Sequence, residues 1–169
     1  MVAVTAERGG DEIPPIEPEI DEFKLAFQLL GGRKTMKRSV DTVLDAHDMI
    51  MRGFDTKSLF HLIESVTVLA TEDALKGVLG ISQRTLQRKR KEDGTTQRLS
   101  PEQSSRAWRF AEILAHATTA LGSQAEAEQW MLEPAMGLDN RRPIDLLSTA
   151  AGVEAVEDHL TRIEYGVYI

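Results

Sequence analysis

The sequence contains no cysteine and few aromatic side chains, which make up 5% of its 169 residues. The absence of cysteine excludes a disulfide framework, a cysteine nucleophile and any zinc site that depends on thiolate ligands. It also fits a reducing compartment. Hydrophobic residues make up 41% of the chain, so it can still bury an aliphatic core, and its length suits one domain or two small ones.

Long apolar runs are missing as well. No stretch approaches the roughly 20 apolar residues that a membrane-spanning helix needs. The N-terminus has no basic segment followed by an apolar one, which a secretion signal would show. The composition therefore predicts a cytoplasmic protein with no membrane partner.

Motifs for catalysis, cofactor binding and metal binding are also missing. Neither a glycine-rich phosphate loop nor the nucleophile elbow GxSxG occurs. Asp45, His47 and Asp48 are close in sequence, but their spacing does not converge on one helix face. No two histidines have the i, i+4 spacing that pairs ligands on a helix; they are His47, His61, His116 and His159. We therefore predict no enzymatic activity, no cofactor and no metal site.

Residues 1–21 form an acidic segment. It carries six carboxylates against one base, Arg8, together with three prolines. Like-charge repulsion and proline both oppose regular structure, which predicts a disordered or loosely docked tail. A solvated tail is the simpler interpretation, and an electrostatic mimic of DNA or a partner-binding arm is the alternative.

Beyond this tail, apolar residues recur at helical spacing and no hairpin pattern occurs, which predicts an all-α fold. We expect helices at 23–30, 39–52 and 58–69, although the β-branched residues 66–68 could instead be extended. A pair of helices should follow at 71–79 and 82–92. A long helix is expected from a cap at Ser100 to Gly122, with shorter helices near 126–131, 144–149 and 153–163.

The helix predicted at 82–92 lies in a cationic window of an acidic protein. Residues 82–98 carry six bases and two acids, a net +4, whereas the formal net charge of −7 leaves −11 on the other 152 residues. The preceding helix, a turn at Gly80 and a cap at Ser82 together form the pattern helix, short turn, helix. Such a motif presents the start of its second helix to the major groove of DNA.

We therefore predict a DNA-binding surface on this second helix. Basic side chains suit the phosphate backbone, and hydroxyl and amide groups suit base edges. The alternative is a solvated basic helix face. Lys76 stands where the usual motif has a small residue, so either the helix crossing is shifted or Lys76 extends outward. The predicted DNA-contacting residues are Ser82, Gln83, Arg84, Thr85, Gln87, Arg88, Arg90 and Lys91.

The C-terminus is aromatic, whereas free termini are usually polar and frayed. Both tyrosines of the chain, Tyr165 and Tyr168, lie in its last five residues. This segment either packs on its own domain or enters a pocket of a partner. Arg141 and Arg142 leave a similar choice, because an arginine pair can bind local carboxylates or the acidic groups of a partner.

Two segments resemble the Xre/MbcA/ParS family of antitoxins. They are GISQRTLQRKRKEDGTTQRLSPEQSSRAWRFAEILAHATTALGS and QWMLEPAMGLDNRRPIDLLSTAAGVEAVEDHLTRIEYGVYI. Residues 138–147 are similar to the family's glycine-rich loop and the helix start after it, although Asp139 and Asn140 stand where glycines are common. Residues 162–168 are similar to its terminal signature. The resemblance is strongest over residues 71–169 and leaves out the acidic tail.

This resemblance implies a helical protein with two parts. Residues 22–98 would form a homodimerising domain that binds the operator of its own operon through the helix-turn-helix. Residues 99–169 would form a small toxin-binding domain, so that a hetero-oligomer with the toxin is possible. The toxin of this class is most often of the RES type, which degrades NAD, and the C-terminal segment of the antitoxin blocks its NAD pocket. The implied toxin-binding residues are Arg141, Arg142, Arg162, Glu164, Tyr165, Gly166 and Tyr168.

Two other classes of protein remain open. In the first, the chain is a stand-alone transcription regulator whose residues 99–169 serve only for oligomerisation. In the second, it is a structural interaction protein that uses its basic face on an acidic protein. A neighbouring gene for a RES-like protein would identify the antitoxin, and an operator gel shift would separate both DNA-binding classes from the third.

Overall fold

The computed structural model of the chain describes residues 21–92 and 97–166. Within these ranges the regular elements are helical, and the β-type pairings are two isolated bridges, Asp55–Arg98 and Ala135–Arg141. The prediction of an all-α fold is confirmed for this part of the chain. The predicted acidic tail lies, apart from Asp21, outside the described residues.

Four helices precede the basic segment: α1 (Glu22–Leu29), α2 (Gly32–Met36), α3 (Val43–Arg52) and α4 (Thr56–Ser65). Side-chain caps set three of their starts, because Asp21, Thr42 and Asp55 each accept a hydrogen bond from a first-turn N–H. The second expected helix therefore begins after Thr42 and not at Ser39, where the sequence placed its cap. The short α2 was not expected.

The expected helix at 58–69 is broken at Val66, which is extended, and Thr67–Ala70 forms a 3₁₀ turn, η1. The cause is a buried carboxylate from a distant helix. Glu128 accepts hydrogen bonds from the backbone N–H groups of Thr67 (2.7 Å) and Val68 (3.2 Å), and also from the Thr67 hydroxyl. These N–H groups begin a helical turn and have no partner within it, so the carboxylate caps η1.

The helix-turn-helix consists of α5 (Glu72–Ala74), the π-helical turn η2 (Leu75–Leu79) and α6 (Gln83–Lys91). A π turn holds one residue more than an α turn, so it rotates the side chains around it. Lys76 is exposed as a result, and Leu75 and Val78 are buried. Lys76 therefore extends outward, which is one of the two outcomes that the sequence allowed.

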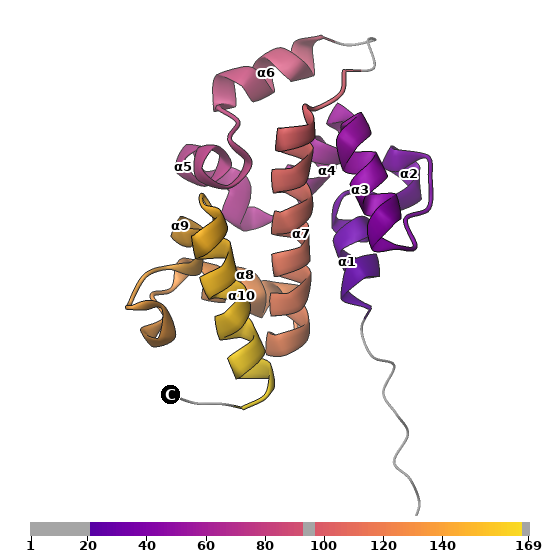
Figure 1. Ribbon diagram of the computed structural model, residues 1–169. Coiled ribbons are helices and arrows are strands. Elements are labelled where there is room, and N and C mark those ends of the chain that lie inside the picture. The colour runs from indigo at the N-terminus through magenta and orange to yellow at the C-terminus, as the bar shows by residue number, and fades with distance from the viewer. Residues whose placement is uncertain (1–20, 93–96, 167–169) are drawn as a thin grey trace, which may run out of the picture.

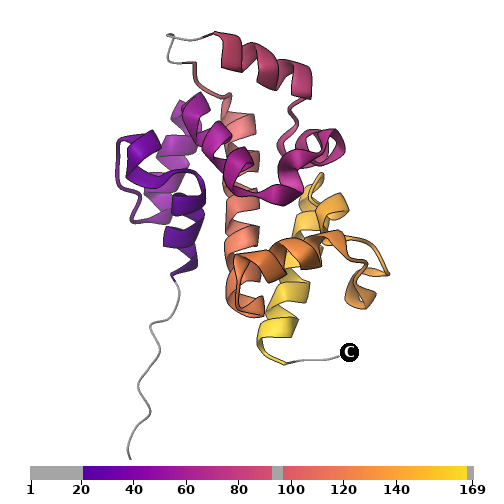
Figure 2. The same ribbon diagram turned by 180° about the vertical axis from the view of Figure 1, so that it is seen from behind.

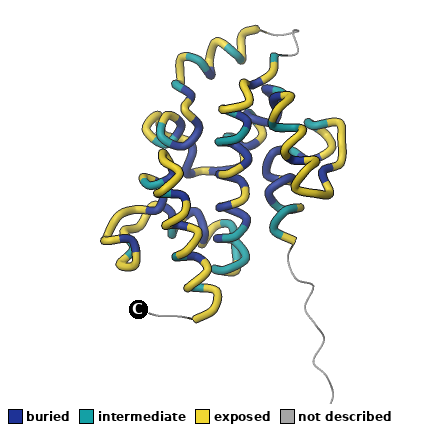
Figure 3. Tube along the Cα trace, in the orientation of Figure 1, coloured by how far each residue is buried: buried dark blue, intermediate teal, exposed yellow. Residues whose placement is uncertain are grey.

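Helix α7 (Pro101–Leu121) runs through the centre of the molecule (Figures 1 and 2). It begins with a capping box between Ser100 and Gln103 and a proline in its first turn, as the sequence predicted. It packs against α1 and α3 and also against α8 (Gln124–Leu132) and α10 (Ala150–Glu164). Figure 3 shows buried residues along its length, and one apolar core extends from Ala26 to Leu160.

The loop between α8 and α10 contains η3 (Met136–Leu138) and α9 (Pro143–Leu146). Asp139 and Asn140 both adopt left-handed backbone conformations, with φ of 55° and 58°. Asp and Asn tolerate this region better than other residues with a Cβ. They can therefore replace the glycines that are common at these positions in the resembling family. No helix in the described part of the chain is long and apolar enough to cross a membrane.

Candidate nucleic-acid and partner interfaces

Helix α6 lies across one end of the molecule, beyond the start of α7 (Figures 1 and 2). Ile81 and Leu86 are buried and anchor it to the core. The opposite side of the helix faces solvent. Among the predicted DNA-contacting residues, those with exposed side chains and no ion-pair partner in the described ranges are Gln83, Arg84, Gln87, Arg88 and Lys91.

Ser82 and Thr85 form the start of α6. The Ser82 Oγ accepts a hydrogen bond from the Thr85 N–H (3.2 Å) and lies 3.0 Å from the Thr85 Oγ1. Both residues are half-buried. Their hydroxyls are therefore engaged within the chain, where they fix the direction in which the helix begins.

Arg90 differs from the other bases of α6 because its side chain points back to the protein. Its guanidinium lies 5.1 Å from the centre of the Phe60 ring, and its Nη2 is 3.2 Å from the Glu64 Oε1. Both partners belong to α4. The contact holds the C-terminal half of α6 against the body, so Arg90 is a positioning residue in the free chain.

Its basic side chains give α6 a cationic surface. The helix carries five bases and no acid: Arg84, Arg88, Lys89, Arg90 and Lys91. Arg84, Thr85, Gln87, Arg88 and Lys91 line one open hollow together with Glu92. Positive charge beside amide side chains suits a polyanion with readable base edges.

The second candidate interface lies at the far end of α10. Tyr165 is 74% exposed, and Gly166 follows it in a left-handed conformation, with φ of 66°. Of the two readings of the aromatic C-terminus, packing on its own domain does not occur for Tyr165. Tyr168 lies outside the described residues.

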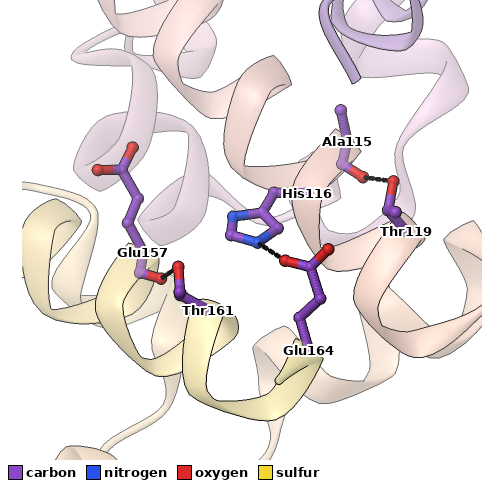
Figure 4. A network of polar contacts seen from close by, with 6 residues as sticks. All are labelled: Ala115, His116, Thr119, Glu157, Thr161 and Glu164. Atoms are coloured by element: carbon purple, nitrogen blue, oxygen red, sulfur yellow. Dashed lines mark hydrogen bonds and ion pairs between the residues drawn. The ribbon is translucent and has the colours of Figure 1, made fainter. Parts of the chain in front are cut away.

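A hydrogen-bonding contact between two helices lies at the point where the C-terminal segment leaves the body. The His116 Nε2 on α7 lies 3.3 Å from the Glu164 Oε2 in the last turn of α10 (Figure 4). Thr161 and Thr119 stand beside this pair, and each hydroxyl donates to a carbonyl of its own helix. Glu164 therefore has a partner within the chain, which the sequence did not indicate.

The two arginines before α9 behave differently. Arg142 makes a bidentate ion pair with Asp145, with its Nε and Nη2 each 2.8 Å from a carboxylate oxygen. This hydrogen bonding raises the pKa of Arg142. Arg141 is exposed, and its carbonyl accepts from the Ala135 N–H at 3.1 Å. In the free chain, Arg142 therefore binds a local carboxylate, which is one of the two interpretations that the sequence allowed.

A cluster beside this loop was missed by sequence reasoning. Trp130 stacks on His159, with ring centres 6.0 Å apart and planes 17° apart. Burial, and then the positive charge of Arg162, lowers the pKa of His159. Leu132 and Met136 nearby in sequence are 46% and 85% exposed. Tryptophan and histidine 29 positions apart give no local signal, and only the packing of α8 against the loop and α10 unites them.

Among residues 21–92 and 97–166, no three histidine, aspartate or glutamate side chains gather to hold a metal ion. Pairing in this part of the chain serves structure instead. The buried Glu128 is the clearest case, since its carboxylate also accepts from the Gln124 amide at 2.8 Å.

Comparisons with known proteins match both ends of this arrangement. Residues 45–112 match the antitoxin Xre-like helix-turn-helix domain, and residues 116–166 match the antitoxin Xre/MbcA/ParS C-terminal toxin-binding domain. The chain is 35% identical to Antitoxin Xre of Yersinia enterocolitica over 124 residues, which cover 72% of this chain and 79% of that protein. It is 29% identical to Antitoxin Xre of Pseudomonas putida over 123 residues, 72% of each chain. The two domain matches meet within α7.

Proposed function

This chain belongs to the Xre family of antitoxins, and we propose that it neutralises an NAD-degrading toxin of the RES type and represses its own operon. It does so by binding, without chemistry of its own. Because operator DNA and NAD are both intracellular, the proposed place of action is the cytoplasm. The observation that carries the proposal is the exposed Tyr165 at the end of a toxin-binding domain.

We propose that the C-terminal segment fills the active-site pocket of the toxin. Tyr165 gains apolar contact on entering a pocket, and its hydroxyl can form a hydrogen bond there. The His116–Glu164 pair supports this role, because it aims the segment before the partner arrives and reduces the entropy lost on binding. Gly166 and Tyr168 would continue into the pocket, and Arg162 would contact its rim.

The loop before α9 supports a second contact with the toxin. Arg141 is exposed and has no carboxylate partner within the described ranges. We propose that it binds an acidic group beside the toxin pocket. Arg142 would join it only by exchanging Asp145 for a carboxylate of the toxin, so its net contribution should be the smaller one.

We propose that α6 enters the major groove of the operator. Arg84, Arg88 and Lys91 would bind phosphates or guanines, and Gln83 and Gln87 would read base edges. Ser82, Thr85 and Arg90 would set the angle of the helix through the contacts described above. Repression then follows if the bound protein covers the promoter of its own operon.

The proposed assembly is a homodimer, because one helix-turn-helix covers only half of a symmetric operator. Helix α3 offers a face for the second copy. Val43, Leu44 and Met51 are 75%, 74% and 59% exposed, and their spacing places them on one side of the helix. Replacing Leu44 and Met51 by glutamate should yield a monomer in light scattering that has lost tight operator binding.

Deletion of Tyr165–Ile169 tests the toxin-blocking mechanism. The loss of a buried aromatic anchor typically costs about 2 kcal/mol or more, roughly thirtyfold in affinity. Cells that make the toxin and the truncated chain should lose NAD and stop growing, whereas operator gel shifts should stay nearly unchanged. The matched control is Leu132→Ala, which removes an exposed apolar side chain elsewhere on the toxin-binding domain.

Full growth rescue and normal NAD with the truncated chain would refute active-site blocking. Failure of the wild-type chain itself to rescue growth, together with intact operator binding, is what a stand-alone transcription regulator predicts. A lost cooperative melting transition would instead show that the segment packs on its own domain. Circular dichroism on the purified variant therefore accompanies the growth assay.

A further inference from the structure

Residues 33–38, RKTMKR, form a second cationic run, outside α6. The run carries four bases and no acid. It covers most of α2 and the turn that follows. The fold brings the end of this run beside Arg52 at the C-terminus of α3 and Arg98 before α7. Segments far apart in the sequence therefore contribute cations to one place.

These residues line a concavity of about 350 Å³. Its cationic members are Lys37, Arg38, Arg52 and Arg98, and its one acidic member is Asp55. We call it the basic concavity. No ion pair between the four cations and a carboxylate occurs within residues 21–92 and 97–166. Asp55 is already engaged, since its Oδ1 accepts from the Lys57 N–H at 2.9 Å.

Hydrogen bonds to backbone carbonyls hold the wall of the basic concavity in place. The Leu99 N–H donates to the Phe54 carbonyl at 2.8 Å, and Arg98 Nη1 donates to the Gly53 carbonyl at 3.0 Å. Gly53 has a φ of 79°, and a Cβ there would lie 2.1 Å from the Leu99 carbonyl oxygen. Only glycine permits this approach. Arg52 and Arg98 are therefore presented by a fixed frame, and Lys37 and Arg38 lie in the turn after α2.

A net charge of about +3 in a concavity of this size suits a phosphate group. Guanidinium groups bind phosphate oxygens bidentately, and lysine adds a compact charge. Lys37 adopts a φ of 54° because it is the left-handed C-cap of α2. Its N–H donates to the Arg33 carbonyl at 3.0 Å and closes α2 at the edge of the concavity.

We propose that the basic concavity binds a backbone phosphate of the same DNA that α6 contacts. This inference rests on the proposed operator binding. Arg98 belongs to the connection between α6 and α7, which the Thr56 N–H ties to α4 through the Gln97 carbonyl at 3.1 Å. The concavity therefore includes part of the connection that leads from α6 into α7 (Figure 1). Phosphate contacts of this kind fix the register of a protein on a duplex and read no sequence.

The test measures duplex affinity against salt for the variant Lys37→Gln/Arg52→Gln. The control Lys24→Gln/Arg109→Gln removes the same charge from exposed positions of α1 and α7. The probes are a 30-base-pair duplex of the DNA upstream of the coding sequence and a random duplex of equal length. Loss of one phosphate contact should lower the log–log salt slope by about one unit, which is about tenfold in affinity between 1 M and 0.1 M salt.

The loss should be equal on both probes, because phosphates carry no base information. The control variant should keep the wild-type slope. Unchanged affinity and slope in the concavity variant, with a wild type that binds DNA, would overturn the concavity alone. A wild type that binds neither duplex would overturn operator binding and the concavity together.

Inorganic phosphate separates the two possible sources of the anion. Titration of the free chain with inorganic phosphate, followed by NMR, should show only weak binding at the basic concavity, with a dissociation constant far above the millimolar range. Saturable submillimolar binding that is lost in the variant, with DNA affinity retained, would identify a site for a free phosphate and overturn the DNA assignment. Matching thermal melts of the variant and control exclude misfolding as the cause of either result.

Discussion

The two candidate interfaces lie on opposite sides of the same core but are prepared for binding in different ways. On α6, Arg84, Arg88 and Lys91 are exposed and have no carboxylate partner in the described part of the chain. At the other interface Arg142 pairs with Asp145 and the Glu164 carboxylate contacts the His116 ring, whereas Arg141 has no carboxylate partner in the described ranges. The nucleic-acid end therefore offers mostly free charge, whereas the partner end adds contacts that fix its geometry.

This difference matches the chemistry of the two proposed ligands, DNA and a toxin pocket. A polyanion rewards unpaired cations, because each contact releases counterions and strengthens long-range attraction. A protein pocket rewards shape, since exposed charges at its rim affect the rate of association more than the affinity. The following predictions test this contrast, from the largest expected effect to the smallest.

Glu128→Ala should produce the largest change, because it removes the carboxylate that joins α8 to η1. The substitution leaves the N–H groups of Thr67 and of the buried Val68 without their acceptor and should lower the free energy of unfolding by about 3 kcal/mol. Urea denaturation measures this, with Gln129→Ala as a control on the exposed side of α8. If both interfaces depend on one shared core, operator binding and toxin binding should weaken together. Weaker binding at one interface only would contradict this.

Arg84→Ala/Arg88→Ala should weaken operator binding, and the loss of affinity at 0.1 M salt should be about a hundredfold larger than the loss at 1 M salt. The reason is that two phosphate contacts contribute about two units to the log–log slope of affinity against salt. Toxin neutralisation should stay intact. Gel shifts across a salt series and the growth assay give the two readings. Arg90→Ala is an informative companion, since its contacts with Phe60 and Glu64 predict a fall in affinity with little change in slope.

Asp145→Asn should free Arg142 from its ion pair and so test whether pairing at the partner interface affects toxin binding. Exposed ion pairs contribute at most about 1 kcal/mol, so the melting temperature should hardly move. If Arg142 binds an acid of the toxin, affinity measured by calorimetry should rise by about twofold to fivefold. A fall in affinity would show that the Arg142–Asp145 pair is recognised as one preformed unit.

Acidification should produce the smallest effect, through His159. Burial lowers the folded-state pKa of His159 below 6.5, so the unfolded chain binds its proton first as the pH falls. Stability from this residue is therefore complete above pH 6.5 and is lost as the pH falls toward the folded-state pKa. The loss should stay below about 1 kcal/mol, because the ring is only half-buried. His159→Gln should flatten this part of the profile of stability against pH.

Local chemistry made much of this structure predictable. The caps at Ser82 and Ser100 and the turns at Gly80 and Gly122 correctly placed α6 and α7, because these signals act within one helical turn. The division of the chain at residues 98 and 99 stays a prediction. The two family matches instead meet inside α7, and one apolar core continues along that helix.

Features that depend on long-range contacts escaped the sequence. The break at Val66 comes from Glu128, which lies 62 residues further along the chain. The shift of the cap from Ser39 to Thr42 is a local effect by contrast, because Asp45 completes a capping box with Thr42. The basic concavity unites segments around residues 37, 52 and 98. Individual charges and caps can be read from a sequence, but which of them meet is decided by packing.

Helix α7 has a consequence for the lifetime of the protein. Its 21 residues extend for roughly 30 Å and pack against elements from both halves, so the chain should open as one cooperative unit. A ligand present at one hundred times its dissociation constant lowers the opened population about a hundredfold. If the toxin binds near Tyr165, as proposed, it should therefore slow amide exchange in η2, which belongs to the other half of the sequence. A protease that cuts only opened molecules would then remove free antitoxin and spare the complex.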